Sequence, residues 1–284
     1  LNEESAPLIY NADETGFASD PSRLRAIGTK GIPLNRLCDG SGRDSTTVLA
    51  CVSASGEYLP PLIVYQGVSV QSRWVAEEEY PGTMYAATRN GWMEETTFFL
   101  WFSNMFVPHV QATRESNGWP DKPAVLFFDG HASHISLRIV EMALQHEIRL
   151  VKFPSHMSDK MQPLDVCVFG PVKRKWEGLL VQHGKTRMGL GNARLQKSEF
   201  GSLLCQLWTT LSTSNIVSGF KTTGLFPLDV SVAKDSWFGI ADLERYRKHQ
   251  RAIMHIQSGA GDSNILPPPG VIGAIHAQDQ PNEE

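Results

Sequence analysis

Three aspartates have the residue type and the positions that phosphodiester chemistry needs. Asp13 follows a short apolar start in YNADETGF, Asp129 closes the apolar run AVLFF, and Asp165 opens a helix-like pattern in MQPLDVCVFG. Each stands at the end or start of an element, so folding could bring them together although they lie far apart in sequence. Mg²⁺ prefers oxygen ligands, and two ions roughly 3.5–4 Å apart can stabilise the attacking and leaving oxygens of an in-line displacement. The pattern therefore predicts a site for two Mg²⁺ or Mn²⁺ ions.

Neighbouring residues could support this site, although each also has a structural interpretation. Glu14 could be a further ligand, and a solvated surface residue is the simpler interpretation. Gln162 could hold a phosphate or a water, or make a structural hydrogen bond. His131 could orient Asp129 or a substrate phosphate. With His134 it forms an H-x-x-H pair, but no third soft ligand has suitable local spacing for zinc, and the pair follows a strand rather than lying within a helix.

The charge pattern places a basic segment after the third aspartate. The net charge is −4, yet residues 166–200 contain seven basic and two acidic residues, whereas residues 1–20 contain five acidic residues and no basic one. An acidic centre beside a basic stretch suits a metal site next to a face that holds phosphates. Lys173, Arg174 and Lys175 are the expected contacts to a DNA backbone, and a solvated helix face is the alternative for any one of them. No apolar run approaches the length of roughly 18 residues that a membrane helix needs.

The elements expected to position these residues alternate between strand and helix patterns. Strands are predicted near residues 7–13 and at 46–53, 59–65, 124–128 and 148–153, and helices at 94–107, 137–147, from 163 onward and at 199–211. The helix at 137–147 is expected to bury Leu137, Val140 and Leu144, and Gly170-Pro171 is expected to kink or divide the helix after Pro163. The fold class is thus α/β: a mixed sheet, with a three-strand antiparallel meander and two further strands, flanked by helices. This is the layout of an RNase H-like fold.

Two segments differ in composition. Residues 1–235 carry the strand and helix patterns and are predicted to form one domain. Residues 236–284 begin with the basic stretch RYRKHQR and then become rich in Gly, Pro, Gln and acidic residues, which is typical of a disordered tail. The four cysteines are scattered without a C-x-x-C spacing, which fits a reducing compartment.

Five segments together resemble the DDE-1 family of transposase-derived endonucleases, which includes the pogo, Tigger, jerky and centromere protein B relatives. They are YNADETGF, TVLACVSASGEYLPPLIVYQG, GWMEETTFFLWFSNMFVPH, VLFFDGHASH and QPLDVCVFGPVKRKW, and NIVSGFKTTGLFPLD resembles the closing motif of the family. The resemblance covers roughly residues 1–230. It implies an RNase H-like fold and an acidic triad at Asp13, Asp129 and Asp165. It also implies DNA as partner, a nuclear location, and strand cleavage that frees a 3′ hydroxyl for transfer to target DNA.

The sequence departs from the family pattern in two ways. Relatives often have His where this chain has Asp159, which adds a negative charge near the third aspartate. Relatives also carry N-terminal helix-turn-helix domains, and none precedes Leu1 in this sequence. Two functions therefore stay open: a metal-dependent DNA endonuclease of the transposase type, and a domesticated, catalytically inactive DNA- or chromatin-binding protein on the same fold. A homodimer is left open as well.

Overall fold

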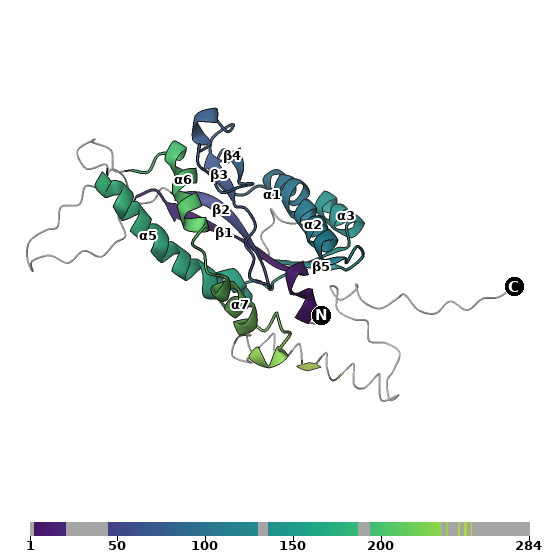
Figure 1. The fold of residues 1–284 in the computed structure, drawn as a ribbon. Helices are drawn as coiled ribbons and strands as arrows, with labels where there is room; N and C mark the ends of the chain where they lie inside the picture. Colours follow the sequence, from purple (N-terminus) through teal and green to yellow (C-terminus); the bar gives the residue numbers. More distant parts are fainter. Residues whose placement is uncertain are drawn as a thin grey trace, which may run out of the picture. The chain divides into compact units, whose positions relative to one another are not determined.

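The computed structural model describes residues 3–20, 45–129, 136–186 and 194–233, together with residues 237, 244, 247, 248 and 251. A compact unit spans Leu1–Ala233, and Lys234–Glu284 form a separate unit. The compact unit is built on a mixed sheet of six strands in the order β4-β3-β2-β1-β5-β6. This confirms the predicted fold class of a mixed sheet flanked by helices (Figure 1).

The central strand is longer than the sequence predicts. β1 (Ile9–Ala18) pairs antiparallel with β2 (Ser45–Ser53) along its whole length and parallel with β5 (Ala124–Phe128). Asp13 therefore lies in the middle of a strand, and the prediction that the strand ends at this residue is wrong. Pairing with β2 outweighs the low strand propensity of Asp and Gly, because strand propensity depends strongly on context.

Two further strands lie beyond β2. β3 (Leu62–Gln66) pairs antiparallel with β2, and its start lies after Pro60 and Pro61, which cannot donate to a strand ladder. β4 (Met84–Thr88) pairs parallel with β3 and was not predicted. β6 (Ile148–Lys152) extends the other edge beside β5.

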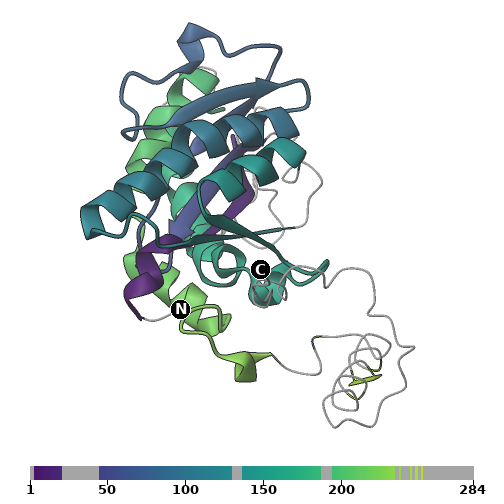
Figure 2. The same cartoon turned by 90° about the vertical axis from the view of Figure 1, so that its right-hand side faces the viewer.

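Helices cover both faces of the sheet and enclose two separate cores. One face packs against α1 (Glu95–Trp101), a π-helical segment (Phe102–Phe106), α2 (Val107–Asn117) and α3 (Leu137–Gln145). The other face packs against α5 (Phe169–Thr186), α6 (Lys197–Trp208) and α7 (Thr213–Thr222), as Figure 1 shows. Figure 2 turns the α1–α3 layer toward the viewer. Short helical turns are η1 (Glu3–Leu8), η2 (Ser72–Trp74), α4 (Ser158–Met161) and η6 (Val230–Val232).

Two prolines are accommodated by π-helical turns rather than by breaks. The π segment Phe102–Phe106 precedes Pro108, and a second π turn, η5 (Leu164–Val168), precedes Pro171 of α5. Because proline lacks an N–H and crowds the preceding turn, a widened turn immediately before it relieves the conflict. The predicted division near Gly170-Pro171 is therefore a widened turn that leads into one continuous helix.

The buried face of α3 differs from the prediction. Ile139 and Ala143 are buried, whereas Leu137 and Leu144 are 73% and 70% exposed. Periodicity alone did not distinguish two apolar stripes on one short helix. The aromatic face predicted for residues 94–107 is confirmed, since Phe98, Trp101, Phe102, Met105 and Phe106 are all buried.

Candidate metal centre

Asp13 lies within β1, and Asp129 lies one residue beyond the end of the neighbouring parallel strand β5. Ala12 of β1 is in register with Phe128 of β5, so the next residues along both strands are Asp13 and Asp129. Ligand atoms of Asp13, Glu14 and Asp129 all lie within 4.8 Å of one another. Asp13 is buried, and Glu14 and Asp129 are half-buried. The strand pairing therefore gathers three carboxylates at one point.

Asp165 reaches this region on the π turn η5. The backbone N–H of Leu164 donates to Oδ1 of the buried Asn11 at 3.1 Å, and Asn11 in turn donates to the Phe127 carbonyl at 3.1 Å. One asparagine thus ties the start of the turn to both β1 and β5. Asp165 itself is exposed, and it lies close enough to raise the pKa of Asp13.

Burial and mutual repulsion both disfavour the charged forms of the carboxylates in the cluster. Burial raises the pKa of Asp13 well above its ordinary value of 3.8, and the charges of Asp165, Glu14 and Asp129 raise it further. The pKa of Asp165 is also raised, first by partial desolvation and then by Asp129 and Asp159, whereas Lys173 lowers it. Repulsion among clustered carboxylates is what a bound divalent cation would relieve.

Gln162 supplies an unpaired amide beside the cluster. Its side chain is 0% exposed, and neither its oxygen nor its nitrogen has a hydrogen-bond partner. The amide nevertheless lowers the pKa of the Asp13 carboxyl as a hydrogen-bond donor would, so the two groups face each other without the geometry of a regular hydrogen bond. Buried amides without partners are rare in folded proteins. The unpaired amide and the repelling carboxylates together fit a site for a hydrated divalent cation.

A shallow hollow lies beside the exposed aspartate. Its volume is about 670 Å³, and it is lined by His156, Ser158, Asp159, Asp165 and Val166. His156 adopts a positive φ of 61° in the turn before α4. No period or spacing in the sequence marks His156, because it lies in a segment predicted as a loop.

The remaining predicted residues have different outcomes. His131 and His134 lie outside the described residues. Lys173, Arg174 and Lys175 are exposed on α5, and Lys175 donates to the Thr210 carbonyl at 2.6 Å. Glu14 was interpreted as a solvated residue, but it is half-buried with its carboxylate beside Asp13. The closeness of Glu14 to Asp129 depends on the register between β1 and β5, which the sequence does not show.

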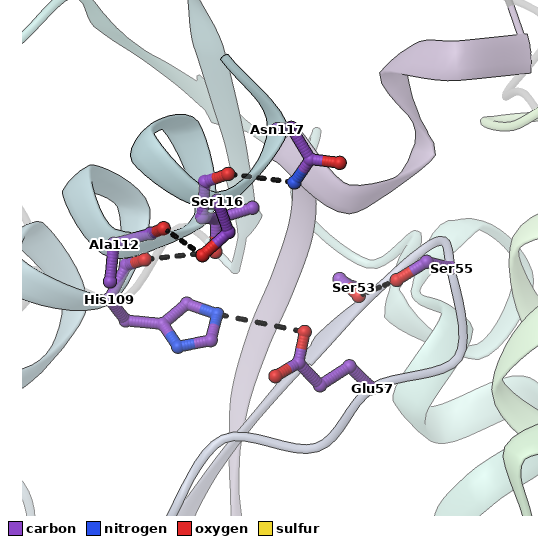
Figure 3. Close-up of polar contacts among 8 residues, drawn as sticks. Ser53, Ser55, Glu57, His109, Ala112, Ser116 and Asn117 are labelled. Atoms are coloured by element: carbon purple, nitrogen blue, oxygen red, sulfur yellow. Dashed lines mark hydrogen bonds and ion pairs between the residues drawn. The ribbon is translucent and has the colours of Figure 1, made fainter. Parts of the chain in front are cut away.

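A second polar cluster joins α2 to the turn between β2 and β3. His109 Nε2 lies 3.9 Å from Glu57 Oε2, and the hydroxyls of Ser53 and Ser55 bond to each other at 2.6 Å (Figure 3). The two serines lie away from the imidazole ring in Figure 3. This arrangement ties two elements together and does not place a serine nucleophile against a histidine base.

Comparison with known proteins identifies similar chains. The family model described as DDE superfamily endonuclease matches residues 43–220. A human pogo transposable element with KRAB domain is 26% identical over 74% of this chain and 34% of its own length. The human jerky protein homolog is 33% identical over 46% of this chain and 23% of its own length. A protein of Cochliobolus lunatus named MFS-type transporter clz9 is 26% identical over 79% of this chain and 24% of its own length.

These relatives are much longer than the matched region. The chain spans about a quarter to a third of the length of the curated relatives above. Within the part of the chain that the structure describes, no helix is both long and apolar enough to cross a bilayer.

A solved structure shares the fold. The pre-cleavage Mos1 transpososome contains a chain with a TM-score of 0.54 and 12% identity, covering 82% of this chain and 58% of that one. A Mos1 transposase paired-end complex with the left transposon end gives a TM-score of 0.50 at 11% identity, covering 82% of this chain and 57% of that one. At this identity the similarity shows the fold alone, and it agrees with the RNase H-like layout predicted from the sequence.

Proposed function

Because the chain belongs to the DDE superfamily of endonucleases, we propose that it cleaves DNA by metal-dependent phosphoryl transfer at Asp13, Asp129 and Asp165. The observation that carries the proposal is the meeting of Asp13 and Asp129 on adjacent parallel strands, with ligand atoms within 4.8 Å. Carboxylates this close repel unless a cation or protons neutralise them, so a purely structural role gives no reason for the arrangement.

The three aspartates have different parts in this proposal. Asp13 and Asp129 are held by the sheet and would bind the cations with fixed geometry. Asp165 is exposed beside the hollow and would complete the site from the side where DNA enters. Two divalent ions, Mg²⁺ or Mn²⁺, would lower the pKa of the attacking water and stabilise charge on the leaving oxygen.

Other residues would position the substrate. The unpaired amide of Gln162 can both donate and accept, so it can orient a water or a phosphate oxygen next to Asp13. Lys173 lies near Asp165 and is exposed, so it can hold the phosphate that approaches the site. Glu14 is a candidate fourth ligand. DNA as substrate supports a nuclear location for the protein.

The test is DNA nicking with matched variants. Purified protein is incubated with supercoiled plasmid and Mg²⁺ or Mn²⁺, and the new ends are examined for 3′ hydroxyls. Asp129→Asn is expected to abolish nicking. Asp121 is also an aspartate, but it is exposed and lies before the start of β5. Asp121→Asn is therefore expected to leave nicking intact. DNA binding without nicking by the wild-type protein would instead support the domesticated, inactive binding protein.

A further inference from the structure

A basic cavity lies at the carboxyl end of β1, away from the acidic cluster. Its volume is about 560 Å³, and its lining includes Arg73, Arg194 and Lys197 together with Ser19 and Ser45. Among the described residues that line it, none is acidic; Glu77 and Glu199 line a neighbouring hollow instead. In a chain with a net charge of −4, three cations around one cavity need a physical reason.

Lys197 is held in place by its surroundings. Its ammonium lies 3.9 Å from the centroid of the Trp74 ring and donates to the Gln66 carbonyl. Trp74 packs in turn on Gly67, where an added Cβ would lie 2.8 Å from the ring. Among the described residues the ammonium has one hydrogen-bond acceptor, the Gln66 carbonyl, so it can still donate to a ligand, and little side-chain entropy is left to lose on binding.

The charges around the cavity repel one another. Burial lowers the pKa of Lys197, and the nearby charge of Arg194 lowers it further. Residues Gln196, Lys197 and Ser198 at the start of α6 also line the cavity, so the positive end of a helix of 12 residues adds to the same field. An anion in the cavity would offset the repulsion between these positive charges.

The position of the cavity fits a DNA strand that leaves the acidic cluster. Asp13 pairs with Ala50 and Ala18 with Ser45, so the two sites are five residues apart along β1, or about 16 Å at roughly 3.3 Å per residue. Phosphates of one DNA strand advance about 3.4 Å each along the helix axis, so the separation corresponds to about five nucleotides. α5 extends from one site to the other, since Lys173 lies near Asp165 and the indole N–H of Trp176 donates to the Ala18 carbonyl at 2.8 Å.

We propose that this cavity, with Arg73, Arg194 and Lys197 around it, binds backbone phosphates of a nucleic-acid strand about five nucleotides from the acidic cluster. The proposal rests on the proposed function in that DNA is the ligand, but it concerns binding and needs no cleavage. The cavity takes phosphodiesters rather than bases, because Lys197 covers the ring of Trp74 that a base would stack on.

Binding is measured by fluorescence anisotropy with a labelled DNA duplex, over a series of salt concentrations. The full chain carries Asp129→Asn throughout, so that cleavage does not interfere. Arg73→Gln and Lys197→Gln, singly and combined, are compared with Lys122→Gln. Lys122 is a matched control, because it also lies over a tryptophan ring, at 3.8 Å, but sits before the start of β5 at the opposite end of the sheet.

Each cation removed from the cavity is expected to weaken binding several-fold and to reduce the slope of log K against log salt by about one. The Lys122 variant is expected to match the parent protein. The Arg73 side chain donates a hydrogen bond to the exposed Gln71 and holds no buried group in the part of the chain that the structure describes, so its replacement keeps the test valid if the Lys197 variant does not fold.

Three results would overturn the proposal. One is an unchanged affinity and salt slope in the combined variant. Another is no DNA binding by the parent protein. The third is that inorganic phosphate alone stabilises the protein through this cavity while the variants bind DNA as the parent protein does. That result would assign the cavity to a free anion. Salt-dependent binding through the cavity without nicking by the wild-type chain would keep this proposal and reject the nuclease.

Discussion

Replacing Asp13 with asparagine is expected to stabilise the metal-free protein. Asp13 is 8% exposed, and ligand atoms of Glu14 and Asp129 lie within 4.8 Å of its own. Two unit charges 4.8 Å apart repel by about 3.5 kcal/mol at an effective dielectric constant of about 20. This repulsion cannot cost more than protonating the carboxyl would, because the protonated form is neutral. Protonating a carboxyl of ordinary pKa 3.8 at pH 7 costs about 4 kcal/mol. The gain from Asp13→Asn is therefore about 3–4 kcal/mol at most.

The stabilisation is read as a thermal shift that depends on pH. Roughly 2–4 °C per kcal/mol for a domain of this size gives a rise in Tm of at most about 6–16 °C at pH 7. The pKa of Asp13 in the folded protein lies above 3.8. Below pH 3.8 the carboxyl is protonated in both states and costs the wild-type protein no stability. As the pH rises from 3.8 through the folded-state pKa, the wild-type protein loses stability. The two proteins should therefore converge near pH 4. Asparagine keeps the oxygen that accepts from the Glu14 N–H at 2.9 Å.

At high concentration, divalent cations should make the wild-type protein more stable than Asp13→Asn. A cation at about 1,000 times its Kd would stabilise the wild-type protein by about 4.1 kcal/mol, which exceeds the gain from Asp13→Asn, and the variant should lose most of this response. Asp121→Asn is the control and should behave as wild type at every pH and Mg²⁺ concentration. If Asp13→Asn were no more stable than wild type at pH 7, or still gained stability with Mg²⁺, the account of the cluster as a strained metal site would be refuted.

Three further predictions concern the elements that hold the site. Gly219→Ala places a Cβ 2.8 Å from the Pro163 carbonyl and should cost about 1–3 kcal/mol in urea denaturation, whereas Gly178→Ala, which meets no atom within 4 Å, should not destabilise. Trp176→Phe removes the donor to the Ala18 carbonyl and should cost about 1–3 kcal/mol; unchanged unfolding would show that the bond contributes nothing. Burial lowers the pKa of His109 below 6.5, so the wild-type protein should lose stability as pH falls through 6.5. His109→Gln should show a shallower loss between pH 7.5 and 5.5, and parallel curves would contradict this.

Strand patterns in the sequence were sufficient to predict five of the six strands but not β4 or the full length of β1. The apolar run Ala124–Phe128 and the β-branched run of β2 are unambiguous, so the central strands were predicted. β4 was not, because MYAAT has few β-branched residues and its side chains are half-buried. The length of β1 was also missed, since only its pairing with β2 shows that residues 14–18 are extended.

The same limit applies to the candidate site. Asp13 and Asp129 could be selected because each stands next to an apolar strand pattern. The closeness of Glu14, and the fact that Gln162 is buried without a partner, depend on register and on the packing of η5 against β1. Neither leaves a periodic signal in the sequence.

Anomalous diffraction from crystals soaked in Mn²⁺ would show whether these carboxylates bind a divalent cation, because it locates the cation without requiring activity. We expect Mn²⁺ bound by carboxylate oxygens of Asp13 and Asp129, with Asp165 completing the site, and no such density in Asp13→Asn crystals. Mn²⁺ absent from these carboxylates in the wild-type protein, at concentrations that support nicking, would contradict this expectation.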